Sequence, residues 1–130
     1  MAKPVHSMIR VVDEERSLAF YREALGLEVA QRVDLDGFSL LYLRGPESAF
    51  ELELTVNASA PPVYDLGDGY GHFAVTVGDL DAEHARLDAA GLAPDPLRAL
   101  ERPGFAARYF FLTDPDGYRI EVIERGGRFA

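Results

Sequence analysis

The sequence predicts an α+β fold of two tandem βαβββ modules, which form a curved mixed sheet with helices on its outer face. Two similar stretches begin at His6 and His72, 66 positions apart. Each runs from a strand-like segment through an aspartate and a helical pattern to Gly-Leu, and three strand-like segments follow. Two copies with this period indicate a duplicated module rather than a solenoid.

The 130 residues predict a single domain that contains both modules. The first module spans about 4–57 and the second about 71–125. The segment between them, about 58–70, holds two consecutive prolines and two glycines and is predicted to be the linker.

The first module opens with the strand-like run VHSMIRVV, and Asp13 is the predicted N-cap of the helix that follows. Leu18, Tyr21 and Leu25 recur at helical spacing, and Gly26 is a natural C-terminal stop. Phe20 and Ala24 flank that stripe. The strands expected next are Leu27–Val33, Phe38–Arg44 and Phe50–Val56.

The second module repeats this order. Asp79 is the predicted N-cap and Gly91 the predicted helix end. The apolar stripe is weaker and consists of Ala82, Ala85, Leu87, Ala89 and Ala90. The expected strands are a weak one near Ala93–Leu100, then Ala107–Thr113 and Tyr118–Glu124. Asp36-Gly37 and Asp116-Gly117 predict hairpin turns.

The composition and charge of the chain exclude several classes of function. The chain has no cysteine, so disulfides, a thiol nucleophile and a thiolate metal site are excluded. A net charge of −9 disfavours nucleic acid and anionic membranes as partners. The N-terminal residues lack the apolar core of a signal peptide, and no apolar run is long enough to span a bilayer. These features predict a cytoplasmic protein.

Histidine and glutamate recur together in the strand-like runs. Side chains alternate along a strand, and in all four runs the apolar face opposes the candidate residue: His6, Glu53, His72 or Glu121. Two imidazoles and two carboxylates suit Zn²⁺, Ni²⁺, Co²⁺, Mn²⁺ or Fe²⁺ better than an all-oxygen calcium site. His84 lacks a counterpart in the repeat and is expected at the surface.

With His6, Glu53, His72 and Glu121 in this order, the chain resembles the glyoxalase I branch of the vicinal oxygen chelate superfamily. The resemblance covers nearly the whole chain. The similar segments are VHSMIRV (5–11), ELTVN (53–57), YGHFAV (70–75) and DPDGYRIEV (114–122). The resemblance implies βαβββ halves and one divalent metal per site, with Ni²⁺ or Co²⁺ favoured and Zn²⁺ possible. The metal ligands would be His6, Glu53, His72 and Glu121.

The resemblance also implies a reaction. Glyoxalase I isomerises the hemithioacetal of methylglyoxal and glutathione to S-lactoylglutathione through an ene-diolate. Glu121 would be the catalytic base and Glu53 the second catalytic carboxylate. Arg10 and Asn57 match residues that bind the thiol part of the substrate. The site would lie between the subunits of a homodimer, with His6 and Glu53 from one chain and His72 and Glu121 from the other.

Other functions on the same scaffold stay open: another metalloenzyme, such as an epimerase or a dioxygenase, or a non-enzymatic small-molecule binding protein. Dioxygenases and fosfomycin-resistance relatives use a His, His, Glu set, and bleomycin-binding relatives lack the metal, so Glu53 argues for the isomerase. The stretch 94–107 lacks a Lys-Gly-Gly-type loop that covers glutathione, and Arg98, Arg102 and Arg108 would have to replace its charge. The tail GGRFA has no assigned role.

Overall fold

The computed structural model describes all 130 residues. It divides the chain into two compact units, Met1–Asp65 and Leu66–Ala130. The division falls inside the predicted linker, 58–70. That the two units act as one domain stays a prediction.

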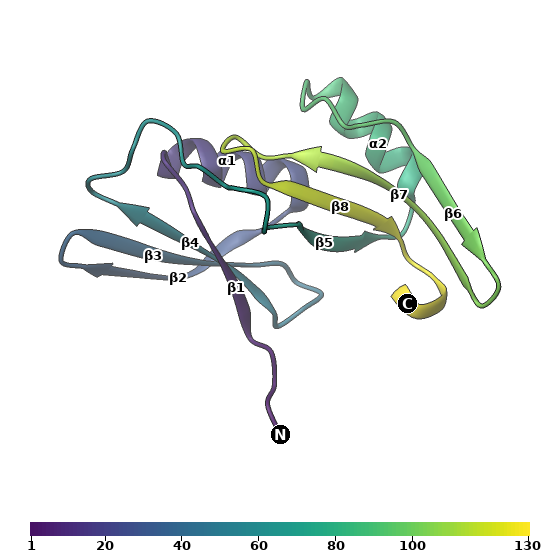
Figure 1. Cartoon of the computed structure of the whole chain (residues 1–130), viewed down its shortest axis with the longest axis horizontal. Coiled ribbons are helices and arrows are strands. Elements are labelled where there is room, and N and C mark those ends of the chain that lie inside the picture. The colour runs from purple at the N-terminus through teal and green to yellow at the C-terminus, as the bar shows by residue number, and fades with distance from the viewer. The chain divides into compact units, whose positions relative to one another are not determined.

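The first unit is a four-stranded sheet with one helix (Figure 1). Its elements are β1 (His6–Arg10), α1 (Glu14–Leu25), β2 (Glu28–Leu35), β3 (Phe38–Arg44) and β4 (Glu51–Asn57). The strand order is β1-β4-β3-β2. Strands β1 and β4 are parallel, and the other pairs are antiparallel.

The second unit repeats the arrangement. Its elements are β5 (His72–Val77), α2 (Leu80–Ala89), β6 (Arg98–Arg102), β7 (Phe105–Thr113), β8 (Arg119–Glu124) and the short 3₁₀ helix η1 (Gly127–Phe129). The order is β5-β8-β7-β6, with β5 and β8 parallel. The predicted α+β class and tandem βαβββ modules are confirmed, and the strands form two sheets, one in each unit.

Both helices begin where the sequence predicts. The Asp13 carboxylate accepts a hydrogen bond from the Arg16 amide at 3.0 Å, and Asp79 accepts one from the Ala82 amide at 3.0 Å. Each satisfies an amide that has no partner within its helix. Gly26 ends α1 with φ of 66°, a left-handed conformation that glycine adopts without steric cost.

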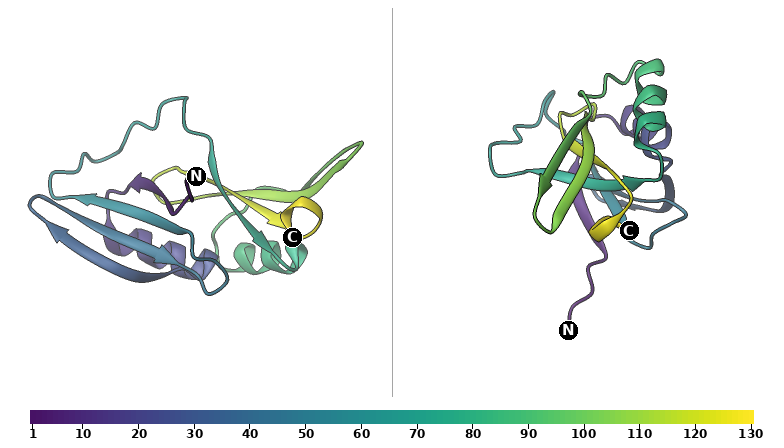
Figure 2. Two further views of the ribbon diagram at one scale, coloured as in Figure 1. Left: turned by 90° about the horizontal axis from the view of Figure 1, so that it is seen from below. Right: turned by 90° about the vertical axis from the view of Figure 1, so that its right-hand side faces the viewer.

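The core of the first unit lies between α1 and one face of its sheet, as Figure 2 shows. The buried apolar strand residues are Ile9, Leu41, Leu43, Leu52 and Leu54, and Val11, directly after β1, is buried as well. The helix contributes Ser17, Phe20, Tyr21 and Ala24. Leu18 and Leu25 of the predicted stripe are only half-buried. The buried face of the helix is therefore rotated from the one that the stripe predicted. The small Ser17 is fully buried and occupies the position that the pattern of large apolar residues overlooked.

Of the predicted stripe of the second helix only Leu87 is confirmed, and its four alanines are wrong. Ala82, Ala85, Ala89 and Ala90 are exposed, and the buried residues of α2 are Leu80 and Leu87. Alanine removes little apolar area from water, so the two leucines decide which face packs. His84 lies between them at helical spacing. It is half-buried with Nε2 2.8 Å from the Asp95 carbonyl oxygen, which corrects the expectation of a surface residue.

The weak strand near Ala93–Leu100 is displaced to Arg98–Arg102, and all five of its residues are exposed. Ahead of it, the Asp95 amide donates to the Phe111 carbonyl at 2.8 Å. The stretch 94–107, which lacks the family's glutathione-covering loop, thus forms most of the β6–β7 hairpin at the edge of the sheet.

Removing the first cap should destabilise the protein measurably. Asp13→Ala leaves the Arg16 amide without its side-chain acceptor, so we expect a loss of about 1 kcal/mol in the free energy of unfolding by urea titration. Asp13→Asn, which retains a capping oxygen, is the matched control and should lose little. Equal stability of the alanine variant and the wild type would contradict the capping role.

Candidate metal centre

The first unit brings His6 and Glu53 together. Parallel pairing sets His6 opposite Glu51 and Met8 opposite Glu53, so His6 and Glu53 are diagonal neighbours on one face. The His6 Nε2 lies 3.7 Å from a Glu53 carboxylate oxygen. We call this pair the first half-site.

The second unit brings His72 and Glu121 together in the same way. His72 pairs with Arg119, and Glu121 lies two residues further along β8. The His72 Nε2 lies 3.8 Å from a Glu121 carboxylate oxygen. We call this pair the second half-site. The two half-sites share strand order, register offset and donor spacing, as the repeat predicts.

The two glutamate side chains differ in how far they are buried. The Glu53 side chain is 10% exposed and that of Glu121 is 20% exposed. On the opposite face Leu52, Leu54, Ile120 and Val122 are buried in the cores. A buried carboxylate needs a charged or hydrogen-bonding partner. Neither unit gathers three candidate metal ligands, and each holds one His/Glu pair.

A buried turn fixes the start of β8, the strand that carries Glu121. The Asp114 carboxylate is buried and accepts hydrogen bonds from the Asp116 amide at 2.9 Å and the Tyr118 amide at 2.8 Å. Gly117 has φ of 94°, which favours glycine. The sequence predicted the turn. The structure adds that this turn determines where β8 begins and thereby where Glu121 lies along the strand.

An aromatic ring lies beside each half-site, a feature that the sequence analysis missed. Tyr42 of β3 is paired with Glu53, and its ring is edge-on to His6 at 5.7 Å. Phe111 of β7 is paired with Glu121, edge-on to His72 at 5.3 Å. A hydrogen bond to Glu53, with desolvation and the negative charge around it, raises the pKa of Tyr42.

The half-sites also differ in charge at a second matched position. Glu51 is the register partner of His6, whereas Arg119 is the partner of His72. The Arg119 guanidinium lies 4.8 Å above the Phe111 ring, and its nitrogen is 2.7 Å from an Asp95 oxygen. The first half-site therefore carries an extra carboxylate where the second carries a fixed cation.

The candidate substrate-binding residues have different surroundings. Arg10 is exposed and lies on the face of β1 that carries His6. Asn57 ends β4, as expected, and its amide donates to the Tyr64 hydroxyl at 3.0 Å. Tyr64 lies in the linker, and no sequence pattern singles it out.

Arg108 does not supply free positive charge. Its guanidinium donates to Glu124 at 2.7 Å and to Asp81 at 3.0 Å, joining β7 to β8 and α2. The hydrogen bond to Asp81 and the surrounding carboxylates raise the pKa of Arg108. This corrects the expectation that Arg108 replaces a glutathione-covering loop. Arg102 donates to the neighbouring Glu101 carbonyl at 2.7 Å.

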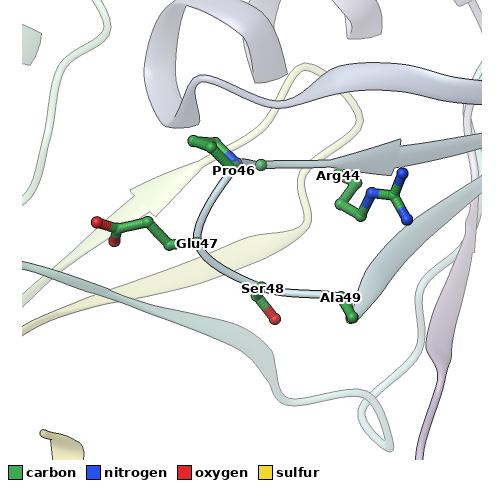
Figure 3. A pocket seen from close by; sticks show the side chains of 6 residues that line it. Arg44, Pro46, Glu47, Ser48 and Ala49 are labelled. Atoms are coloured by element: carbon green, nitrogen blue, oxygen red, sulfur yellow. The ribbon is translucent and has the colours of Figure 1, made fainter.

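A shallow depression of about 400 Å³ lies elsewhere, on the turn that joins β3 to β4 (Figure 3). Its lining is a single stretch, Arg44–Ala49. None of the candidate ligand or substrate-binding residues contributes to it, so it is not the candidate centre.

The fold and the paired half-sites define the class of protein. The chain belongs to the Glyoxalase/Bleomycin resistance protein/Dioxygenase superfamily, whose family model matches residues 3–122. No helix is both long enough and apolar enough to cross a membrane.

The similar proteins within this family are lactoylglutathione lyases. The lyase of Haemophilus influenzae is 35% identical over 92% of this chain and 90% of its own length. A probable lactoylglutathione lyase of Synechocystis sp. is 34% identical over 95% and 96%. The trypanothione-dependent glyoxalase I of Leishmania major superposes with a TM-score of 0.77 at 35% identity, covering 95% of this chain and 87% of that one. Against three plant relatives from Arabidopsis thaliana and Brassica oleracea, the chain spans only 35–44% of their length.

The raised pKa of Tyr42 is testable in metal-free protein. The folded state holds this phenolic proton more tightly than the unfolded state. The resulting stability is fully present below the pKa of unfolded tyrosine and is lost as the pH rises through the folded pKa. We expect the ultraviolet signal that Tyr42→Phe removes to titrate above the ordinary range. Glu53→Gln should move it back toward that range, and an unmoved signal would contradict the link between the two side chains.

Proposed function

We propose that this chain isomerises the hemithioacetal of methylglyoxal and glutathione to S-lactoylglutathione, and so contributes to methylglyoxal detoxification. The observation that carries the proposal is the pair of matched His/Glu half-sites in a chain that matches a lactoylglutathione lyase of Haemophilus influenzae and a probable one of Synechocystis sp. over nearly their full length. A cytoplasmic location stays a prediction.

The residues fit one divalent cation. His6, Glu53, His72 and Glu121 would hold it, with Ni²⁺ or Co²⁺ favoured and Zn²⁺ possible. Within each half-site the nitrogen and oxygen are less than 4 Å apart, which suits two ligands that each lie about 2 Å from one ion. The ion would supply a Lewis acid for the substrate oxygens, stabilising the negative charge that develops as the ene-diolate forms.

The proton transfer falls to Glu121. Its carboxylate would remove a proton from the carbon that bears sulfur and return it to the neighbouring carbon, so the reaction is an isomerisation that needs no oxidant. Glu121 is twice as exposed as Glu53, which supports Glu121 as the base that reaches the substrate. Glu53 would be the second carboxylate. Arg10 and Asn57 would bind the thiol part of the substrate.

The isomerase assay tests the function. Metal-free protein should gain activity with Ni²⁺, Co²⁺ or Zn²⁺ on methylglyoxal plus glutathione, followed by thioester absorbance. Glu121→Gln should lower kcat by about 10²–10⁴-fold while the protein stays folded, because it removes the base. Trypanothione should be assayed beside glutathione, since one relative depends on it. Failure with every metal and thiol would refute the isomerase, and oxygen uptake with a catechol and Fe²⁺ would favour a dioxygenase.

A complete site needs one half-site of each kind, and we propose that they come from two chains of a homodimer. Mixing Glu53→Gln with Glu121→Gln protein under conditions of subunit exchange tests this. In a mixed dimer one site carries both substitutions and the other neither. Random exchange should therefore restore about a quarter of the wild-type activity from two inactive parents. No recovery, despite exchange shown by mass spectrometry of labelled chains, would refute a site built from two chains.

A further inference from the structure

The duplicated sheets place one aromatic residue at the same point of each half-site, and the two residues differ by a single hydroxyl. Tyr42 and Phe111 occupy the strand next to the glutamate, in direct register with Glu53 and Glu121. Both rings meet the neighbouring histidine edge-on, at 5.7 and 5.3 Å. Tyrosine and phenylalanine thus pack against the histidine equally well. Packing therefore does not explain why Tyr42 carries a hydroxyl.

Cross-strand pairing sets Tyr42 directly opposite Glu53, and the Tyr42 hydroxyl donates a hydrogen bond to the Glu53 carboxylate. A hydroxyl donor restricts the rotation of a carboxylate and occupies one of its lone pairs. Phe111 offers Glu121 only a carbon ring. The less exposed glutamate therefore has a hydroxyl donor beside it, and the more exposed one has a hydrocarbon at the matched position.

We propose that Tyr42 is a positioning residue that holds Glu53 as a fixed carboxylate and thereby leaves the proton transfer to Glu121. This inference rests on the proposed isomerase function. In that reaction the carbon–hydrogen electron pair becomes the carbon–carbon double bond of the ene-diolate, the carbonyl π pair moves onto its oxygen, and a Glu121 oxygen takes the proton. The double-bond pair then binds that proton at the adjacent carbon, the carbonyl re-forms at the carbon that bears sulfur, and the proton of the original hydroxyl ends on the neighbouring oxygen. Without its hydrogen bond, Glu53 gains the freedom to perform the same transfer.

A double variant separates this role from simple packing. Glu121→Gln alone should be nearly inactive. Adding Tyr42→Phe removes the hydroxyl that holds Glu53, so that both half-sites carry a phenylalanine ring. We expect kcat of this double variant to be about tenfold higher than that of Glu121→Gln alone, which is less than the full effect of one general base. The matched control is Glu121→Gln with Tyr109→Phe, which removes a hydroxyl two residues from Phe111 and should give no recovery.

The reciprocal substitution reverses the effect. Phe111→Tyr places a hydroxyl beside Glu121, and we expect a several-fold lower kcat with little change in KM, because the base is restrained while the substrate-binding residues are unchanged. Circular dichroism and thermal unfolding should show every variant folded like the wild type.

Metal binding provides a readout that does not depend on turnover. Tyr42→Phe should weaken Ni²⁺ binding, measured by chelator competition, by about 10–100-fold, since residues that orient a metal ligand have effects of that size. If the wild type binds metal but never turns over the hemithioacetal, the proposed function fails, while a weakened affinity in Tyr42→Phe still supports the hold on Glu53. If the wild type is active, recovery no greater than in the Tyr109→Phe control overturns the inference. Unchanged metal affinity in Tyr42→Phe also overturns it.

Discussion

The parallel pairing of β1 with β4 and of β5 with β8 is the constraint on which the rest of the candidate centre depends. In both pairs the glutamate lies two residues beyond the register partner of the histidine, so both side chains emerge on the same face about 4 Å apart. A slip of one residue in either ladder would turn the glutamate into the core and bring a leucine or isoleucine to the open face. The buried leucines that face the helices and the Asp114 turn ahead of β8 favour that register.

Duplication supplies the geometry twice, and later substitution gives the copies different chemistry. Tyr42 against Phe111 and Glu51 against Arg119 leave the backbone arrangement intact while changing the hydrogen bonding and charge beside each glutamate. A carboxylate that only holds the metal can stay fixed, whereas one that also carries the proton must reach two neighbouring carbons. The different neighbours of Glu53 and Glu121 give a physical reason to assign proton transfer to only one of these two equivalent glutamates.

Strand parity predicted much of this, because the alternation of side chains is a local property. It correctly set Ile9, Leu52 and Leu54 in the core opposite the candidate ligands. Spacing alone could not have found the two aromatic residues beside the glutamates. Tyr42 lies 11 positions before Glu53, but Phe111 lies 10 before Glu121. A fixed repeat length therefore aligns Tyr42 with the buried Phe110, on the wrong face. The alanines of α2 misled for a related reason, since composition did not reveal that two leucines decide its orientation.

Local periodicity, capping chemistry and a visible repeat are enough to predict the duplicated βαβββ order, the helix caps at Asp13 and Asp79, and the residue types of the candidate centre. The residues that surround each glutamate become visible only in the folded chain. Cross-strand register brought Tyr42 to Glu53, the end of β4 brought Asn57 to Tyr64, and the β6–β7 hairpin committed Arg108 to Asp81 and Glu124. Such contacts join residues that are distant in the chain, and their existence depends on how strands pair, which no local pattern specifies.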